Sequence, residues 1–285
     1  MKKLIVTIFA LVVTSSVMWG QQNKDTLFVK VINKYVLADG QKTSKYYPIG
    51  QEFRDTLNRL LNVINFDDST HRVTTYSRYF YKGMNRVKEE DYSQNKLQWV
   101  ITMEYNAGGA LVAKTIRHAT SKDTAVYLSI AYINVDGHPV KETGYTAVGK
   151  TAYSAKLTYD KAGELILKKV KAKGIPPIDS VLFLKRVLTY DSLQRIVRED
   201  LSEKLVGGEK RLSYVYTYGK EGFLNETQQF DATGKLFLRK EFIYTIQRKR
   251  IQEIKTFDGS GKLLEWRAFR YERYGSQPYN VRVID

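Results

Sequence analysis

The sequence contains no cysteine among its 285 residues. This absence excludes disulfide bonds, thiolate metal sites, a cysteine nucleophile and a lipid anchor attached to cysteine. A chain without disulfide bonds must be stabilised by its backbone hydrogen bonds and its core alone.

Proline is also rare, with five copies. The only adjacent pair, Pro176-Pro177, cannot serve a central strand, so we interpret residues 174–179 as a hinge.

Long hydrophobic runs are missing except near the N-terminus. Two lysines precede the apolar run Leu4–Val13, and Ser15 and Ser16 follow it ahead of Gly20, with the bulky Met18 and Trp19 in between. This order is typical of a secretory signal, so we expect residues 1–20 to be removed by a cut near Gly20. A retained membrane anchor is the alternative, although the run is short for a span of about 20 residues. Residues 21–285 are then expected to form a single domain.

Motifs that carry chemistry are also missing. The histidines His71, His118 and His138 lie far apart, and Asp67-Asp68 and Glu89-Glu90-Asp91 are interpreted as solvated hairpin ends. There is no Gly-x-Ser-x-Gly turn and no phosphate-binding glycine-rich loop. We therefore predict a protein without enzymatic activity, catalytic residues, cofactor or metal. The enzymatic alternative is a hydrolase whose acids lie on the hairpin turns.

What the sequence does contain is one short pattern that recurs along its length. In Phe230–Leu236, Asp231 suits the first position of a type I turn, and Gly234 supplies the positive φ of a three-residue hairpin loop. The related windows are Arg54–Leu60, Tyr81–Val87, Tyr105–Leu111, Ile133–Pro139, Tyr159–Leu165, Tyr190–Ile196, Tyr218–Leu224 and Phe257–Leu263. The fifth residue is Gly or Asn in all but one window, which predicts a left-handed backbone there.

Residues 51–64 are ambiguous. Their apolar residues have helical spacing, and a helix is the alternative structure. However, Asp55–Leu60 closely parallels Asp191–Ile196, which lies between two alternating runs of strand character. We therefore predict a strand, a turn and a strand over residues 51–64.

The spacing of the pattern defines the fold class. From Tyr105 the windows recur every 26 to 31 residues, with weaker turn signals between them. Half of this spacing corresponds to one strand and one short loop. We predict an all-β protein, a long antiparallel meander of repeated β-hairpins that forms one coiled or partly closed sheet.

The windows resemble the tyrosine–aspartate (YD) repeats of Rhs proteins, whose motif is Tyr-Asp-x-x-Gly-x-Leu. Tyr159–Leu165 matches this motif, and Tyr214, Tyr216 and Tyr218 match its return strand. The resemblance spans roughly residues 54–271 and implies stacked hairpins in a coiling sheet that acts as a scaffold. In Rhs proteins the repeats form a shell around a toxic C-terminal region. We expect no such cargo here, because the chain ends just past its last repeat.

Positive charge is the only feature of the composition with functional content. The chain has 46 Lys and Arg against 30 Asp and Glu, a net charge of +16. The surplus is high over residues 235–273, where aromatic residues are interleaved with it. The candidate anion-binding residues are Arg239, Lys240, Arg248, Lys249, Arg250, Arg267 and Arg270. The alternative is that these cations only prevent exposed strands from pairing edge to edge.

These observations favour an exported, non-enzymatic repeat protein of the cell envelope that works as an interaction scaffold. Its expected location is the periplasm, the outer-membrane surface or the exterior. The expected partners are acidic polysaccharide, an anionic lipid surface or another envelope protein, and export disfavours nucleic acid. An outer-membrane β-barrel is the alternative, since the alternation and the number of turns allow it, whereas the polar faces of many strands oppose it.

Overall fold

The computed structural model describes residues 26–119, 124–172, 181–205, 208–245 and 250–273. The expected signal at residues 1–20 and the expected hinge at 174–179 lie outside these residues. The strands are β1 (Thr26–Ala38), β2 (Gln41–Asp55), β3 (Leu60–Phe66), β4 (Val73–Lys82), β5 (Asn85–Ser93), β6 (Lys96–Tyr105), β7 (Leu111–Ala119), β8 (Thr124–Val135), β9 (His138–Thr146), β10 (Thr151–Tyr159), β11 (Leu165–Ala172), β12 (Val181–Tyr190), β13 (Ile196–Leu205), β14 (Gly208–Tyr218), β15 (Leu224–Phe230), β16 (Leu236–Thr245), β17 (Arg250–Asp258) and β18 (Leu263–Arg273).

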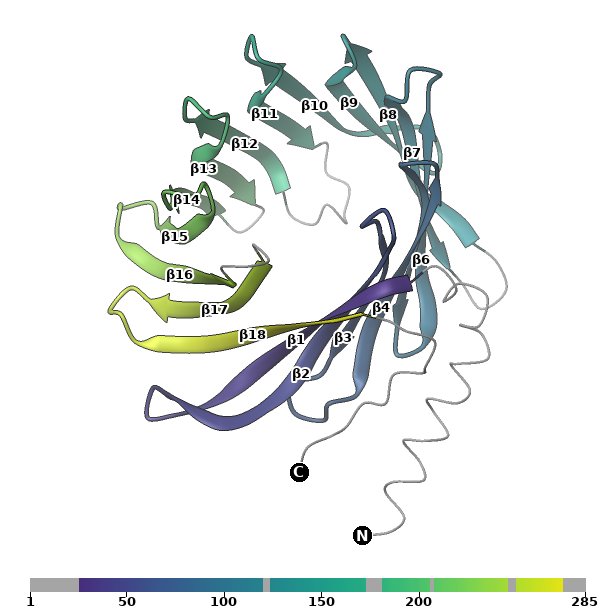
Figure 1. Ribbon diagram of the computed structural model, residues 1–285. Coiled ribbons are helices and arrows are strands. Elements are labelled where there is room, and N and C mark those ends of the chain that lie inside the picture. The colour runs from purple at the N-terminus through teal and green to yellow at the C-terminus, as the bar shows by residue number, and fades with distance from the viewer. Residues whose placement is uncertain (1–25, 120–123, 173–180, 206–207, 246–249, 274–285) are drawn as a thin grey trace.

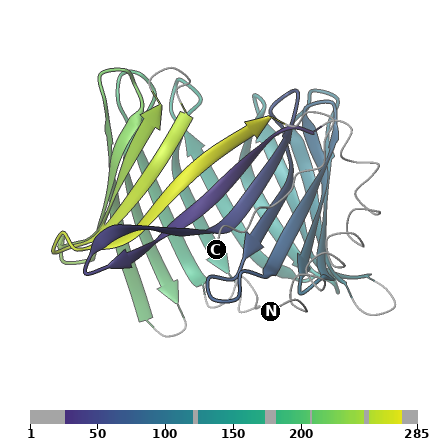
Figure 2. The same ribbon diagram turned by 60° about the horizontal axis from the view of Figure 1, so that its bottom comes forward.

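These strands form one 18-stranded antiparallel sheet in which each strand pairs with the next along the chain. The sheet closes because β1 pairs with β18 as well as with β2, for example with Val31 opposite both Arg270 and Gln51. Figures 1 and 2 show the result, a barrel in which the purple β1 lies beside the yellow β18. The predicted all-β hairpin meander is confirmed. Its closure is complete, as the barrel alternative required.

Two clusters of buried side chains stabilise the wall. The larger one lies on β8, β10 and β11 and contains Leu128, Ile130, Leu157 and Val170. The smaller one lies on β1 to β3 around Val29. Both clusters join neighbouring strands, because side chains on one face of a sheet pack against those of the adjacent strands. The core therefore follows the wall, as expected for a barrel of this many strands, which is too wide to be filled from within.

The predicted turns are present at all nine windows. The fifth residue has a positive φ in eight of them, including Gln194 (φ 60°), although glutamine is not a typical residue for this conformation. In the remaining window, Gly83 adopts the positive φ instead of Asn85. The prediction for residues 51–64 is also confirmed, because β2 and β3 pair across a turn at Asn58 (φ 61°).

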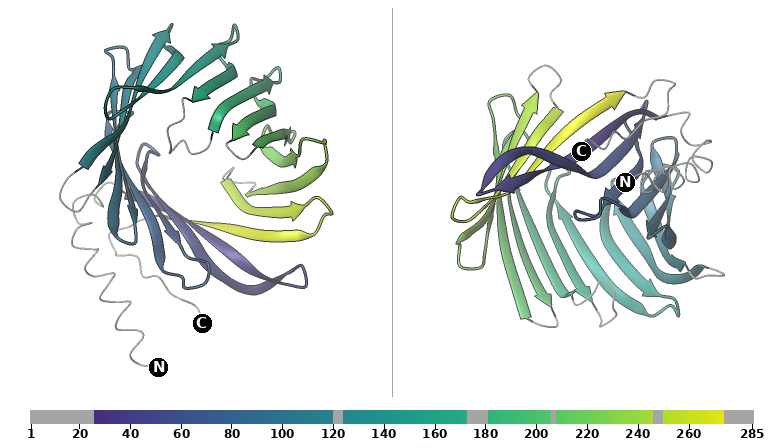
Figure 3. Two further views of the ribbon diagram at one scale, coloured as in Figure 1. Left: turned by 180° about the vertical axis from the view of Figure 1, so that it is seen from behind. Right: turned by 90° about the horizontal axis from the view of Figure 1, so that it is seen from below.

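The turns divide between two ends of the barrel. The described turns that follow even-numbered strands lie at one end, which we call the tyrosine end. Figure 3 shows the ring from behind and from below. Seven windows are at this end. The windows at Phe230 and Phe257 follow the odd strands β15 and β17, so they lie at the opposite end. The sequence pattern therefore merges two sets of turns that the barrel separates.

A tyrosine hydrogen bond recurs at the tyrosine end. The hydroxyl group of the first window residue donates to a backbone carbonyl oxygen at the start of the preceding strand. The pairs are Tyr81 to Leu60 (2.9 Å), Tyr105 to Arg86 (2.8 Å), Tyr159 to Pro139 (2.9 Å), Tyr190 to Leu165 (3.0 Å) and Tyr218 to Ile196 (2.8 Å). Each bond connects one hairpin to the hairpin before it. This explains physically why tyrosine precedes the turn at this end.

Gly234 offers a direct test of the turn geometry. Its φ is +81°, and no other atom lies within 4 Å of the place that a Cβ atom would take, so strain rather than collision decides the outcome. We expect Gly234→Val to lower the free energy of unfolding by about 1–3 kcal/mol, and Gly234→Asn by much less. Thermal or urea unfolding of the two variants measures the difference. Equal unfolding curves would contradict a left-handed backbone at this position.

Candidate anion-binding face

The structure disperses the basic residues that the sequence suggested as one site. Arg239 forms ion pairs with Glu226 (3.1 Å) and Glu241 (2.8 Å), and Arg270 pairs with Glu272. Lys240 follows Arg239 directly in β16, so it points to the other face of the wall. Arg250 lies over the ring of Tyr271, and Arg248 and Lys249 lie outside the described residues. Their anion-binding role stays a prediction, but most of these guanidinium groups already have a carboxylate or aromatic neighbour.

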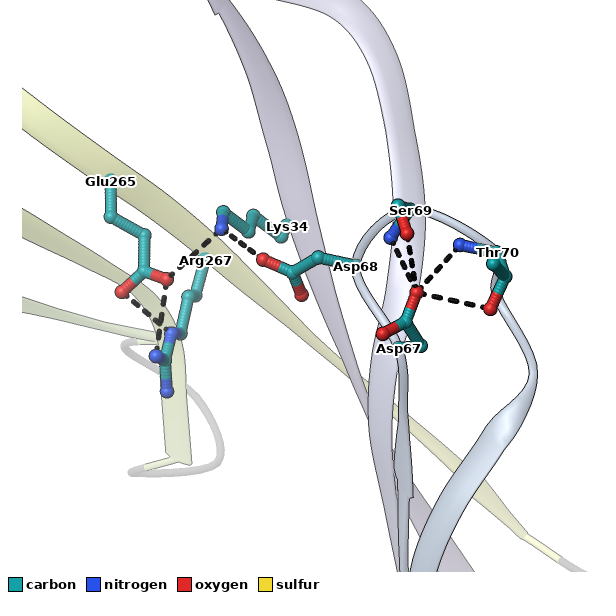
Figure 4. A network of polar contacts seen from close by, with 7 residues as sticks. All are labelled: Lys34, Asp67, Asp68, Ser69, Thr70, Glu265 and Arg267. Atoms are coloured by element: carbon teal, nitrogen blue, oxygen red, sulfur yellow. Dashed lines mark hydrogen bonds and ion pairs between the residues drawn. The ribbon is translucent and has the colours of Figure 1, made fainter. Parts of the chain in front are cut away.

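Arg267 belongs to a network that joins three parts of the barrel. Its guanidinium group pairs with Glu265 (2.8 Å) on the same strand, and Glu265 also lies 3.8 Å from the ammonium group of Lys34 on β1. Lys34 pairs in turn with Asp68 from the turn between β3 and β4 (Figure 4). The positive charge of Arg267 is therefore balanced within the protein.

A different set of cations is brought together by the strand register. Lys141 on β9 lies opposite Lys156 on β10, Lys156 lies opposite Lys169 on β11, and Lys169 lies opposite Lys185 on β12. Directly opposed residues point to the same face of a sheet. With strands spaced about 4.8 Å apart, the backbone positions of the four lysines span roughly 14 Å. We call these four residues the lysine row.

The lysine row is exposed and forms no ion pair within the described residues. All four side chains are exposed, and none forms an ion pair or a side-chain hydrogen bond with any residue that the structure describes. Lys168, next to Lys169 in β11, shows the contrast. It points to the other face, is partly buried and pairs with Glu142 at 2.9 Å. The pairing of cations in this wall is therefore selective, and no described carboxylate forms an ion pair with the row.

The position of the core shows which side of the wall carries the row. On β10, Ala155 and Leu157 are buried and belong to the larger cluster, whereas Lys156 between them is exposed. Side chains on the concave side of a curved sheet converge, and those on the convex side spread apart. The buried set therefore points into the barrel, and the lysine row lies on its outer surface.

A hollow of about 1080 Å³ adjoins the row on β9 to β11. Lys141, Lys156, Lys169 and the further lysine Lys171 line it, together with the hydroxyl-bearing Ser154. Ammonium and hydroxyl groups are hydrogen-bond donors suited to phosphate, sulfate or carboxylate oxygens. The lysine row itself provides several donors in a line across four strands, which matches an extended anion better than a small one.

The hydrolase alternative would use the turn aspartates as its acids. Their carboxylates instead accept hydrogen bonds from residues of their own turns. The Asp231 carboxylate accepts hydrogen bonds from the Thr233 hydroxyl (2.6 Å) and from the Lys235 backbone N–H (3.0 Å). These bonds lower the pKa of Asp231, and the Ser260 hydroxyl does the same for the pKa of Asp258. A general acid at neutral pH needs a raised pKa, the opposite shift.

The histidines are separated in space as well as in sequence. His71 contacts the ring of Tyr47, His118 that of Trp99 and His138 that of Tyr159. Within the described parts of the chain, no three His, Asp or Glu side chains are grouped so as to hold a metal ion.

Over the same residues, no helix is long and apolar enough to cross a membrane.

The lysine row was not predicted from the sequence. Its members are 13 to 16 residues apart, close to the length of one strand and one turn, and this spacing is the only signal they leave. Whether two such residues share a face depends on the exact register, because a shift of one residue moves a side chain to the other face. Loop lengths and bulges decide that register.

No family model matches the sequence, and no curated protein matches it. Similar solved structures include a porin-like protein from Bacteroides uniformis, with 11% identity over 87% of this chain and 96% of that chain and a TM-score of 0.41. A porin-like protein from Bacteroides vulgatus is 11% identical over 85% of this chain and 97% of that chain, with a TM-score of 0.37. The Tc holotoxin pore of Photorhabdus luminescens is 12% identical over 81% of this chain and 14% of that chain, with a TM-score of 0.33. All three TM-scores are below 0.5, so function must be argued from the residues of this chain.

Proposed function

We propose that this protein is an exported, non-enzymatic barrel of the cell envelope that binds anionic polymers, such as acidic polysaccharides, on its outer wall. The observation that supports this function is the lysine row, in which four exposed cations lie directly opposite one another and form no ion pair with the residues that the structure describes. Elsewhere in the same wall, cations such as Arg239 and Lys168 have carboxylate partners. A partner molecule would supply the missing negative charge.

The electrostatic repulsion within the lysine row supports the same proposal. Like charges directly opposite each other destabilise a sheet, and the row contains three such pairs in succession. A barrel has no free strand edges, so these lysines are not needed to prevent edge-to-edge pairing. Edge protection was the alternative explanation for the positive charge. A repulsive row on a closed wall is better explained by a ligand that neutralises it.

We expect the wild-type protein to bind polygalacturonate, an acidic polysaccharide, at about 0.05 M salt and to lose binding near 1 M, where the screening length falls to about 3 Å. Changing Lys141, Lys156, Lys169 and Lys185 together to Gln should weaken binding by at least about tenfold. The same variant should unfold at a higher temperature in low salt, because three repulsive contacts are removed. Isothermal titration calorimetry and thermal unfolding measure the two effects.

A matched control removes the same amount of charge elsewhere. Arg239, Lys240, Arg267 and Arg270, all changed to Gln, lower the net charge equally but leave the lysine row intact. We expect this variant to bind polygalacturonate nearly as well as the wild type. If it loses binding while the row variant retains it, the site lies in β16 to β18 and the proposal is wrong. Absence of binding by the wild type at low salt would also contradict the proposal.

An outer-membrane barrel that spans the bilayer is the second candidate. It is favoured by complete closure, by the even number of antiparallel strands and by strand lengths of 7 to 15 residues. Opposing it, the outer face of the wall, which would meet lipid, carries Lys156 and Lys169 in mid-strand. A lysine at the bilayer midplane costs about 2–4 kcal/mol.

Extraction behaviour distinguishes the two candidates. A barrel held at the surface by charge is released from envelope membranes by high salt or by alkaline carbonate. A spanning barrel stays in the membrane under both treatments and conducts ions when reconstituted. We expect release. Retention with conductance would replace the proposed function by the second candidate.

A further inference from the structure

Large apolar side chains are exposed where the lysine row ends. Ile133 on β8 lies directly opposite Lys141, the first residue of the row, so the isoleucine continues the row on the same face. Val135 lies two residues further toward the tyrosine end and points to the same side of the strand. Their exposed fractions are 55% and 53%. An exposed pair of branched aliphatic side chains beside four unpaired lysines forms an amphipathic surface.

The elements around this surface leave it accessible and positively charged. At one end of the row, Lys185 lies opposite Ser202 on β13, and at the other end Lys141 lies opposite Ile133 on β8. Neither of these two directly opposed residues is acidic. Asp136 and Asp160 are acidic turn residues at the border of the hollow. The Asp160 carboxylate accepts hydrogen bonds from the backbone of its own turn and so is directed inward to that turn. The outer surface of β8 to β12 therefore combines an apolar corner with a cationic wall.

We propose that this surface docks on an anionic lipid bilayer, with Ile133 and Val135 inserted at the headgroup boundary and the lysine row on the lipid phosphates. The inference rests on the proposed anion binding and specifies its partner. Charge complementarity selects lipid over a second copy of the chain, because another copy would present the same lysines and repel the first. Basic residues with exposed apolar side chains beside them are what binding to an anionic membrane surface requires.

The test is sedimentation of the protein with vesicles of phosphatidylcholine containing 30% phosphatidylglycerol at low salt, with pure phosphatidylcholine vesicles as the reference. We expect binding to the anionic vesicles only. Changing Ile133 and Val135 together to Ser should weaken vesicle binding about tenfold, while binding of polygalacturonate is unchanged. The quadruple Lys→Gln variant of the row should weaken both, each lysine contributing roughly fivefold on vesicles.

The chain provides a matched control for the apolar pair. Leu57 and Met84 are at least as exposed, at 57% and 68%, but lie on the turns after β2 and β4, on other strands than the row. Changing both to Ser should leave vesicle binding unchanged. Equal losses in the two double variants, or no loss in the Ile133 and Val135 variant, would overturn the lipid inference. The proposed function fails separately, if polygalacturonate does not bind the wild type.

Discussion

Replacing Asp55 by Ala is expected to lower the free energy of unfolding by about 3–5 kcal/mol, the typical cost of removing one partner from a buried ion pair. Asp55 is 1% exposed at the end of β2. Its carboxylate accepts hydrogen bonds from the backbone N–H groups of Leu57 (2.9 Å) and Arg59 (2.8 Å) and from the Arg59 side chain (2.6 Å). All three donors lose their acceptor in the variant.

Arg59 makes the loss larger than that of an ordinary turn aspartate. Its guanidinium group lies over the Tyr81 ring and also donates to the Gly83 carbonyl oxygen of the next turn at the tyrosine end. Asp55 thus positions a side chain that connects two hairpins. Asp231→Ala is the control, because that carboxylate makes the same backbone bonds but is less buried and has no arginine partner among the described residues. Equal losses in urea unfolding would show that the ion pair adds nothing.

Replacing Gly144 by Val is expected to cost about 3 kcal/mol, at the upper end of the range for overpacking a core. Gly144 on β9 lies opposite Tyr153 on β10, and a Cβ atom at Gly144 would overlap the tyrosine ring. Tyr153 is 5% exposed and packs in the larger core cluster. The ring covers the glycine so closely that one of them must move.

A double variant identifies this mechanism. In a Tyr153→Ala background the ring is absent, so the Val side chain at position 144 meets empty space and buries apolar surface there. We expect Gly144→Val to be neutral or stabilising in that background, which gives a large coupling energy in a double-mutant cycle. Additive losses measured by urea unfolding would mean that the glycine is needed for backbone reasons alone.

The sequence predicts the local structure of this protein well, because turn chemistry is local. Asp231 and Gly234 determine their turn through hydrogen bonds and backbone freedom that depend on no distant residue. The same reasoning correctly identifies the hairpin over residues 51–64 against the helical spacing of its leucines. It does not separate the turns at Phe230 and Phe257 from the others, since the two ends of the barrel use nearly the same loop.

The non-local features were not predictable in the same way. Closure depends on the accumulated twist of eighteen strands, and no sequence pattern in β1 or β18 predicts that these two strands pair. The surroundings of the candidate anion-binding residues depend on the fold in a related way. Arg239 and Arg270 lie in a segment that is dense in cations, and the sheet brings carboxylates next to them, while their anion-binding role stays a prediction. The lysine row has low density in sequence and becomes a cluster only through the register of β9 to β12.

Closure also has a consequence for how the barrel assembles. Every pairing between the described strands is made by neighbours along the chain except one, the seam in which Val31 meets Arg270. Hairpins form in microseconds, whereas joining the two ends of a long chain is slow. Until β18 is in place, β1 presents an unpaired row of N–H and C=O groups that can recruit another molecule's strand. The period between formation of the first hairpin and arrival of the last strand is when this protein is most vulnerable to aggregation.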